Sequence, residues 1–488
     1  MVFNKLDLIV IILFFLSMVV VGIWSYFRSK NSEDYFVAGG KLPWWLAGIS
    51  HHVSGHSGVV FVAYAAVAYS YGFTIYIWWA APVGIAILAT AKIFPIYWVR
   101  LRKNFQIQSP LEYLKIRYNV LTQQIMAWIG VLLKVFDLGA KWAAIGILLH
   151  VVAGVPMTAG ILVSGLVTLI YVTFGGLWGV IVTDLIQFII QVLGGVVMFV
   201  LVVKRLGGLD SIGGIWKQLP PNHSHLVNGP YTMGFAAIML FLYFLSYNGG
   251  SWSLATRYIS STSEKEASKA ARLSGILYLI WPLILFFPMW AAPIIIPGLA
   301  NPDESYAWLM LKILPQGMIG LVIASLFAAT MGMTASDVNT VAAVITRDIL
   351  PVVSVKFRDD KHSLRTARIT TFVFTLATIA IALNYLKFGG VLGLIINWFG
   401  ALLGPTSMPL LLGLLPIFKY CGPRAAISSI IAGIATFIIT KDMNLNSLTL
   451  EVSLPTIVAA IVFVGIGLAT RSVPDRVQDL LASLKKPT

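Results

Sequence analysis

The sequence contains a single cysteine, so the chain cannot form an intramolecular disulfide. Charged side chains are also scarce: they make up 11% of the 488 residues, whereas 58% of the residues are hydrophobic. In soluble proteins charged residues account for about a quarter of the chain. This shortage of charge, together with a mean hydropathy of +0.87, excludes an ordinary soluble domain and indicates a protein embedded in a lipid bilayer.

Motifs of enzyme chemistry are missing as well. The sequence has no P-loop, no dinucleotide-binding motif and no spacing of histidines or cysteines typical of a metal site. The glycine-rich stretch GGLWG at 175–179 lies between two apolar stretches, which predicts a tight turn between helices rather than a phosphate site. We therefore expect neither an enzyme nor a bound cofactor.

The net charge of +15 does not indicate nucleic-acid binding, because the positive residues are distributed as in a membrane protein. If the N-terminus lies outside the cell, most of the 34 Lys and Arg residues fall in cytoplasmic loops. One of these loops holds Arg257, Lys265, Lys269 and Arg272. The pattern predicts a multi-pass protein of the plasma or inner membrane with a cytoplasmic C-terminus. Its partners would be lipid and a small solute, and we expect a monomer.

Thirteen apolar stretches are long enough to cross the membrane, for which about 20 residues are needed. They cover residues 6–27, 44–71, 74–99, 121–152, 157–177, 179–204, 232–256, 270–298, 314–349, 367–386, 391–417, 424–440 and 454–470. The sequence therefore predicts an all-α integral membrane protein with about thirteen transmembrane helices.

Two of these stretches are interrupted by polar residues and glycines. The second contains SHHVSGHSG at 50–58, and the seventh contains YFLSYNGGSWSLATRY at 243–258. The interruptions fall in the first helix of two successive groups of five helices. Paired breaks of this kind are typical of transporters built from inverted repeats, which bind their solute between the breaks. The alternative is that the small residues only allow the helices to pack closely.

Several segments resemble the solute:sodium symporter family. They are YVTFGGLWGVIVTDLIQFIIQ (171–191) and IASLFAATMGMTASDVNTVAAVITRDIL (323–350), which are the most specific, with SPLEYLKIRYN (109–119), RYISSTSEKEASKAARLSG (257–275) and GPTSMPLLLGLLPIFKYCGPRAAISSIIAG (404–433). The resemblance implies a leucine-transporter-like fold of two inverted five-helix repeats, each with a broken first helix, and cation-coupled uptake of a solute by alternating access. It divides the chain into an N-terminal helix and loop (1–43), a first repeat (44–204), a second repeat (205–418) and late helices with a tail (419–488).

The same resemblance places a sodium ion between the first broken helix and the segment 323–350. Backbone carbonyls at Val53, His56 and Ala329 would bind it, together with two hydroxyl groups. The two hydroxyl positions hold Gly332 and Met333 in this chain. Sodium requires oxygen ligands, and a thioether is a poor substitute. The sequence therefore predicts a damaged sodium site and transport that depends weakly or not at all on sodium.

One ionisable side chain is a candidate for the role of the missing ion, and a second is its expected partner. His56 stands where the family usually has an aliphatic residue, and Asp184 is expected to line the same region as its partner. His56 would act either as a proton-coupling site or as a fixed positive charge. A third interpretation is that His51, His52 and His56 only hydrogen-bond neighbouring helices. The oxygens that could otherwise restore a sodium site are those of Thr330, Thr334, Ser336 and water.

Three charged residues lie within the fourth apolar stretch. Lys134, Asp137 and Lys141 are spaced i, i+3 and i+7, so they share one stripe of a helix. Asp137 can neutralise one lysine, which would leave one positive charge over. Lys141 would then meet an anionic or hydroxyl-rich solute. The alternative is an ion pair with a purely structural role.

Five further positions are expected to contact the solute. Asn397 and Ser251 match polar, solute-facing positions of the family. Val60 matches a position that is polar in sugar-transporting members. Trp398 and Trp78 border the expected site, and Trp79 lies beside Trp78 in the same stretch. An amide, a hydroxyl and indole rings suit a sugar, polyol or sugar acid, which we favour over an amino acid or another organic acid. A solute-sensing receptor with the same fold is the alternative function.

Overall fold

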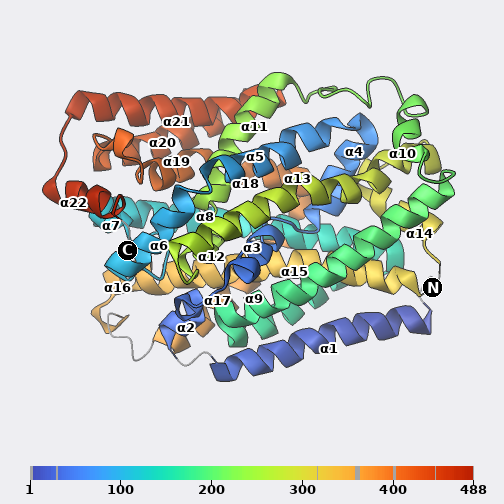
Figure 1. The fold of residues 1–488 in the computed structure, drawn as a ribbon, viewed down its shortest axis with the longest axis horizontal. Coiled ribbons are helices and arrows are strands. Elements are labelled where there is room, and N and C mark those ends of the chain that lie inside the picture. The colour runs from blue at the N-terminus through green and yellow to red at the C-terminus, as the bar shows by residue number, and fades with distance from the viewer. Residues whose placement is uncertain are drawn as a thin grey trace.

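The computed structural model describes residues 4–28, 31–315, 317–357, 363–398, 403–443, 445 and 447–486. Over these residues the chain is almost entirely helical, and its β pairing is limited to two isolated bridges, one of them between Leu42 and Ser261. Most of the long helices run along the long axis of the molecule, and the two termini lie at opposite ends of that axis (Figure 1). The predicted all-α architecture is confirmed.

The helices fall into long and short classes. The long ones are α1 (Lys5–Arg28), α8 (Val120–Ala153), α9 (Met157–Arg205), α11 (Met233–Leu245), α13 (Glu264–Ile295), α15 (Met318–Val344), α17 (Ser363–Ala382), α20 (Pro423–Asp442) and α21 (Leu448–Thr470). The short ones are α2 (Ser32–Val37), α3 (Trp44–Val53), α4 (Ala65–Tyr71), α5 (Ala81–Thr90), α6 (Phe94–Phe105), α7 (Leu114–Arg117), α10 (Ser211–Gly214), α12 (Trp252–Ile259), α14 (Ser305–Ile313), α16 (Leu350–Val353), α18 (Gly390–Trp398), α19 (Gly404–Leu412) and α22 (Asp475–Ser483).

Fewer helices than the predicted thirteen are long and apolar enough to cross a membrane. Nine helices in the described part qualify, or ten if the bent pair Tyr76–Thr90 and Phe94–Phe105 forms one span. The difference arises because several predicted spans are divided into short helices. α9 covers two predicted stretches and changes direction at Gly176, whose φ of 56° favours glycine. The expected turn at 175–179 is therefore a kink within α9.

The first predicted break is present. α3 ends at Val53, and helical structure resumes at Val59. The intervening backbone packs tightly against α13, since a Cβ on Gly55 would lie 1.8 Å from the Tyr278 hydroxyl oxygen. Only glycine allows this approach, which explains the glycine in SHHVSGHSG.

The second predicted break is present as well. A π-helical turn covers Ser246–Gly250 and contains Gly249, whose φ is 128°. Ser251 has an extended backbone, and α12 begins at the next residue. The break is held by α6, because the Trp98 indole N–H donates a 2.8 Å hydrogen bond to the Asn248 carbonyl. Unwound backbone inside a membrane protein is tolerated where its polar groups find such partners.

The third predicted span is bent, which the sequence did not indicate. α5 and α6 meet at an angle of 55°. The bend places Thr90, at the end of α5, beside the second break, where its hydroxyl donates to the Asn248 side-chain oxygen at 2.6 Å. The bend and the second break therefore support each other.

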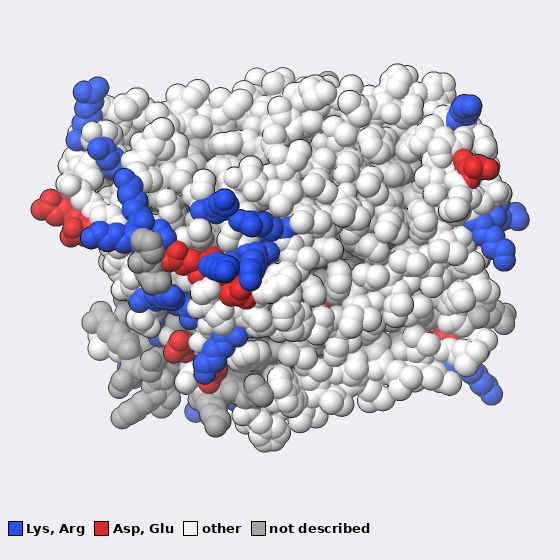
Figure 2. Space-filling model, viewed as in Figure 1, with Lys and Arg blue, Asp and Glu red and all other residues white. Residues whose placement is uncertain are grey.

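Charged side chains form one large group on the side of α6, α7 and α22 and a smaller group at the opposite end, and the surface between the two groups is almost free of charge, as Figure 2 shows for one face. Lysines and arginines are most abundant at the end where Figure 1 places α6, α7 and α22. Between the ends the outer helices expose apolar side chains; on α1, Leu13 is 60% and Val20 64% exposed. A band of this kind is suited to contact with lipid tails.

Substituting Gly249 by alanine should destabilise the protein by about 1–3 kcal/mol, because a side chain at this φ is strained and its Cβ would lie 2.5 Å from the Trp98 indole nitrogen. Thermal unfolding in detergent measures the effect. Gly213→Ala is the matched control, since no atom lies within 4 Å of the position that a Cβ would take there. Equal melting temperatures for the two variants would contradict a strained second break.

Candidate functional site

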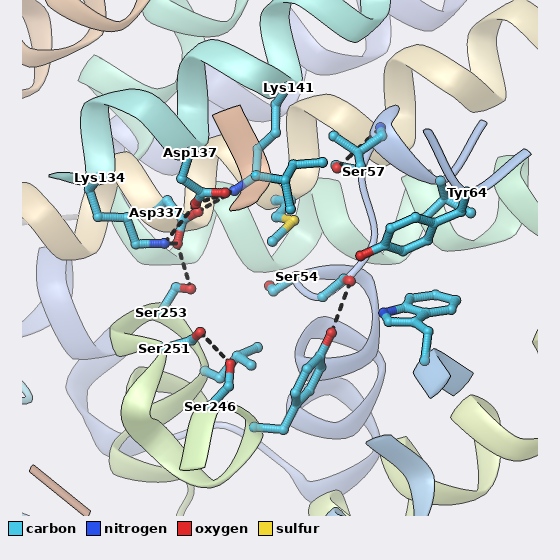
Figure 3. Close-up of a pocket in the computed structure, with 18 residues that line it drawn as sticks. Ser54, Ser57, Tyr64, Lys134, Asp137, Lys141, Ser246, Ser251, Ser253 and Asp337 are labelled. Atoms are coloured by element: carbon cyan, nitrogen blue, oxygen red, sulfur yellow. Dashed lines mark hydrogen bonds and ion pairs between the residues drawn. The ribbon is translucent and has the colours of Figure 1, made fainter. Parts of the chain in front are cut away.

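The two breaks face a common cavity, as predicted (Figure 3). Its wall combines residues of both broken helices with residues of α8, α15 and α18. The lining residues are Ser54, Gly55, Ser57, Val59, Val60, Tyr64, Trp79, Lys134, Asp137, Lys141, Ser246, Tyr247, Ser251, Ser253, Leu254, Met333, Asp337 and Ile395.

Four charged side chains form a closed cluster on one wall of the cavity, the Lys–Asp quartet. The Lys134 ammonium lies 3.0 Å from carboxylate oxygens of both Asp137 and Asp337. The Lys141 ammonium lies 2.9 Å from Asp137 and 2.6 Å from Asp337. Three members come from α8, whereas Asp337 comes from α15. On α12, the Ser253 hydroxyl donates to Asp337 at 2.7 Å, so the quartet also reaches the second broken helix.

The quartet contains two positive and two negative side chains, which corrects the expectation that one lysine would keep a surplus charge. Sequence analysis missed Asp337, although a carboxylate within an apolar stretch is itself a signal of an ion pair or a functional site. The spacing along α8 places Lys134, Asp137 and Lys141 on one stripe. Only the packing of α15 against α8 supplies the second carboxylate.

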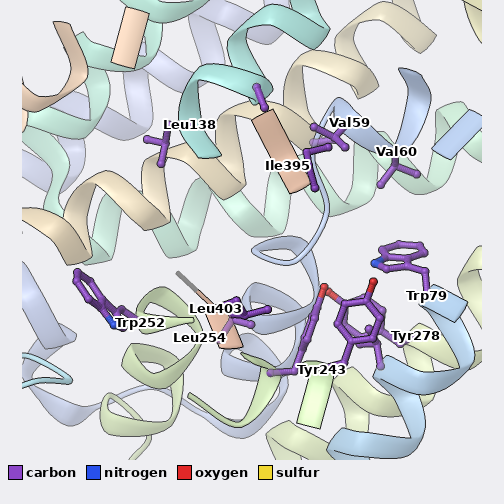
Figure 4. Close-up of a cluster of buried hydrophobic side chains, with 14 of the residues drawn as sticks. Val59, Val60, Trp79, Leu138, Tyr243, Trp252, Leu254, Tyr278, Ile395 and Leu403 are labelled. Carbon is purple, nitrogen blue, oxygen red and sulfur yellow. The ribbon is translucent and has the colours of Figure 1, made fainter. Parts of the chain in front are cut away.

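Apolar and aromatic side chains form another part of the wall. Val59, Val60, Leu254 and Ile395 lie around the cavity, and the Trp79 indole borders it (Figure 4). Val60, a predicted solute contact, is thus part of the cavity wall. A cavity that combines hydroxyls, charges and an indole suits a solute with hydroxyl groups on one side and C–H groups on another.

The tryptophan at the cavity is Trp79 rather than the predicted Trp78. The Trp78 ring stacks on Tyr231 with a centroid distance of 5.4 Å and meets Tyr64 and Phe235 edge-on. Neighbouring residues of a helix point in directions about 100° apart, so only one of the two indoles can face the cavity. The sequence alone could not decide which.

Of the predicted polar contacts, Ser251 lines the cavity, and its hydroxyl lies 2.7 Å from that of Ser246. Asn397 and Trp398 form the end of α18, but their side chains lie outside the described residues. Ser253 is an additional hydroxyl that sequence analysis did not single out. It lies two residues after Ser251 on the same half-helix.

His51 connects the two breaks. One ring nitrogen lies 2.8 Å from the Ser274 hydroxyl on α13, and the other lies 3.2 Å from the Tyr247 carbonyl in the second break. With both nitrogens in hydrogen bonds, His51 fits the interpretation as a packing residue.

His52 and His56 lie against each other despite the break, with ring centroids 4.4 Å apart. His56 Nδ1 lies 3.0 Å from the His52 carbonyl, and its ring stacks on Tyr278. Its Nε2 is buried and has no hydrogen-bond partner within the described part of the chain. Packing is therefore part of the role of both rings.

Asp184 is paired with Arg257, which corrects the expected pairing with His56. Asp184 Oδ2 lies 3.2 Å from the Arg257 guanidinium and accepts a 2.5 Å hydrogen bond from Ser50. Arg257 also bonds to the Ser336 hydroxyl. It is fully buried on α12, so its assignment to a cytoplasmic loop was wrong. The helix that resumes after the second break carries Arg257 into the protein.

Direct hydrogen bonds join the first broken helix to α15 near the predicted sodium position. The Gly58 amide donates to Thr330 at 2.9 Å, and the hydroxyls of Ser54 and Ser336 lie 3.0 Å apart. The Thr334 hydroxyl donates to a carbonyl of its own helix. The three hydroxyls that were candidates to restore a sodium site thus already have partners.

Two other oxygens near this position have no hydrogen-bond partner among the residues that the structure describes. They are Asp184 Oδ1 and Gln187 Oε1, both buried. A Cβ on Gly332 would lie 3.0 Å from the first, 2.5 Å from the second and 3.0 Å from the Val53 side chain. The predicted residues Val53, Asp184 and Gly332 therefore do meet, while Gln187 was missed. These oxygens could ligate a hard cation.

The other two predicted positions on α15 differ in their surroundings. Ala329 is fully buried, and Met333, one turn later, lines the cavity. Among the described residues there is no group of three or more His, Cys, Asp or Glu side chains that could hold a metal ion. The arrangement is thus one of a cavity beside a small cluster of oxygens.

Comparison with known proteins gives a consistent result. The model of the sodium:solute symporter family matches residues 35–433. The sodium/glucose cotransporter of Vibrio parahaemolyticus is 28% identical, and the match covers 96% of this chain and 91% of that protein. The sodium/sialic acid symporter NanT of Aliivibrio fischeri is also 28% identical, over 91% of this chain and 89% of that protein.

Solved structures show the same fold. A Na+-coupled sialic acid symporter in a substrate-bound, outward-open state superimposes with a TM-score of 0.83 at 20% identity, covering 96% of this chain and 98% of that chain. Mhp1, a nucleobase-cation-symport-1 family transporter, gives a TM-score of 0.63 at 13% identity, covering 92% and 98%.

Replacing Lys141 by methionine should cost about 3–5 kcal/mol of stability, because two buried aspartates then face a single lysine. The double variant Lys141→Met/Asp337→Asn restores equal numbers of opposite charges and should recover most of the loss. Thermal unfolding in detergent measures both, with the exposed Lys387→Met as control. Additive losses in the double variant would contradict a mutually neutralising quartet.

Proposed function

Because the chain belongs to the sodium:solute symporter family, we propose that it is a secondary active transporter which imports a small, hydroxyl-rich solute by alternating access. Its relatives are transporters, and the chain is a transporter rather than an enzyme. The observation that carries the proposal is the cavity between the two helix breaks, with its hydroxyls, its Lys–Asp quartet and its indole. A site of this kind between broken helices is where transporters with inverted repeats bind their solutes.

The chemistry of the wall favours a sugar, a polyol or a sugar acid. Serine hydroxyls and the quartet can exchange hydrogen bonds with several solute hydroxyls, and Trp79 offers a flat surface to C–H groups. The names of two relatives, which refer to glucose and sialic acid, agree with this class. An amino acid or another organic acid is the alternative solute. A solute-sensing receptor remains the alternative function and would bind solute without accumulating it.

For coupling, we propose that sodium contributes weakly or not at all. The two positions at which the family resemblance implies hydroxyl ligands hold Gly332 and Met333. Hydrogen bonds from Ser54 and Gly58 already connect the first broken helix to α15, which is the connection that a bound sodium would otherwise make. The proposal of His56 as a proton site or fixed charge stands without Asp184 as its partner.

We also propose that the end of the bundle with α6, α7 and α22 faces the cytoplasm. The positive side chains gather there (Figure 2), as the positive-inside rule requires. The N-terminus, at the opposite end (Figure 1), would then lie outside. The repeat boundaries at 44–204 and 205–418, and a monomeric state, remain proposals as well.

The substitutions Ser251→Ala and Asn397→Ala should each raise the half-saturation concentration of uptake several-fold, since a lost hydrogen bond to the solute costs on the order of 1 kcal/mol. Uptake of labelled sugars into proteoliposomes measures this. Ser429→Ala is the control, because that hydroxyl bonds only within α20. If both variants behave like the control, the solute binds elsewhere.

Uptake of the solute should change little when choline replaces sodium. The protein offers too few oxygen ligands to compensate for the water molecules that a sodium ion would lose on binding. Proteoliposomes with identical pH on both sides test this directly. Saturable stimulation by sodium would contradict the proposal. Loss of that stimulation in Gln187→Leu would then locate the ion at the two unpartnered oxygens beside Gly332.

A further inference from the structure

We propose that Asp337, in place of His56, is the coupling proton site, and that a proton on Asp337 allows a carboxylate-bearing solute to bind Lys141. This inference rests on the proposed function and specifies its solute class and its coupling ion. It follows from the position of the Lys–Asp quartet, whose four side chains line the cavity. A charged solute in the cavity would therefore lie next to these buried charges.

The charges of the cavity wall are balanced before a solute binds. The quartet has equal numbers of positive and negative side chains, and each side chain is at most 7% exposed. A carboxylate that entered this cavity alone would leave a buried negative charge without a partner, which the protein interior strongly disfavours. One proton bound to a quartet carboxylate removes that excess.

In the proposed step Asp337 gains the proton and becomes a neutral acid. Lys141 loses one anionic partner, and the solute carboxylate takes the place of that partner. No covalent bond in the solute is made or broken.

Asp337 is favoured over Asp137 because of where each is attached. Asp137 lies on α8 with both lysines, at spacings of three and four residues, so all three move together. Asp337 lies on α15 and accepts a hydrogen bond from Ser253 on α12. Protonation of Asp337 therefore alters a contact between two different elements, α15 and the second broken helix, whereas protonation of Asp137 would alter contacts within one helix.

The surroundings of Lys141 suit an anion. α12 begins at Trp252 without a side-chain cap, and the next two residues, Ser253 and Leu254, line the cavity. The start of a helix carries a partial positive charge and free amide donors. Lys141 and this half-helix thus present positive charge to the same cavity from two sides.

The other ionisable groups around Asp337 are accounted for. Lys134 and Lys141 face it from α8, and Asp137 faces the same two lysines. Arg257 lies one turn after Ser253 on α12 and is already paired with Asp184. The remaining titratable groups of the cavity wall are the phenols Tyr64 and Tyr247. Asp337 is thus the carboxylate through which the proton would act on both α15 and α12.

Proteoliposomes test the proposal with matched pairs of solutes: D-glucuronate against D-glucose, and N-acetylneuraminate against N-acetylmannosamine. With the lumen one pH unit more alkaline than the medium, and the potential clamped by potassium and valinomycin, the acids should accumulate up to about tenfold, the limit for one proton per solute. Changing the clamped potential should not alter this ratio, because a proton and a carboxylate together carry no net charge.

Uptake that does not depend on the pH difference, or that responds to the potential, overturns the inference and leaves the transporter proposal intact. No uptake of any of the four overturns the proposed solute class and the inference with it.

Asp337→Asn provides the residue-level test, with Asp303→Asn as control. The Asn variant imitates the protonated state, so it should lose pH-driven accumulation while retaining exchange of labelled for unlabelled sugar acid. Binding gives a second measurement, which can be made even if the variant is less stable. At alkaline pH the sugar acids should raise the melting temperature of Asp337→Asn more than that of the unchanged protein. In Lys134→Met/Asp337→Asn, which has one lysine and one aspartate left, the preference for acids over neutral sugars should disappear. A pH response in Asp337→Asn equal to that of the unchanged protein overturns the assignment.

Discussion

A charge buried within an apolar helix bundle needs a partner of opposite sign in the same bundle, because neither lipid nor the packed interior solvates it. Two ion-pair groups meet this requirement here and connect the elements around the cavity. The Lys–Asp quartet links α8 to α15 and, through Ser253, to α12. The Arg257–Asp184 pair links α12 to α9 and, through Ser50, to α3. Both broken helices are therefore attached by charge to the long helices beside them.

The second constraint is the backbone of the two breaks. Peptide groups released from a helix must find other partners where water is excluded. In the second break the Asn248 carbonyl accepts from Trp98, and in the first break the Gly58 amide donates to Thr330. Glycine is needed where the chain comes close to its neighbours, as Gly55 does to Tyr278. These partners leave the breaks open on the side of the cavity, where a solute can complete the remaining contacts.

These features bear on the proposal that this transporter operates with little or no contribution from sodium. A bound cation serves two purposes: it supplies positive charge, and it ties the first broken helix to the helix opposite. In this protein the hydrogen bonds of Ser54 and Gly58 connect the first broken helix to α15. Positive charge is present in the side chains of Lys134, Lys141 and Arg257. What covalently attached charge cannot supply is energy from an ion gradient, because it never leaves the protein. A mobile proton at a cavity carboxylate would supply it.

Much of this architecture could be predicted from the sequence, because it depends on local composition. Long apolar stretches must be helical in a membrane, and glycines with serines at 50–58 and 246–253 interrupt two of them. The stripe of Lys134, Asp137 and Lys141 could be recognised too, since it follows from the period of a single helix, and so could departures from a family motif. Contacts between helices were decided only by the tertiary structure. Asp337 completes the quartet from nearly two hundred residues away, Arg257 rather than His56 takes Asp184, and Trp79 rather than Trp78 faces the cavity. A single sequence determines which side chains share a face of one helix, because that depends on the 3.6-residue period. It does not determine how neighbouring helices rotate about their axes, and that rotation decides which buried charge finds which partner.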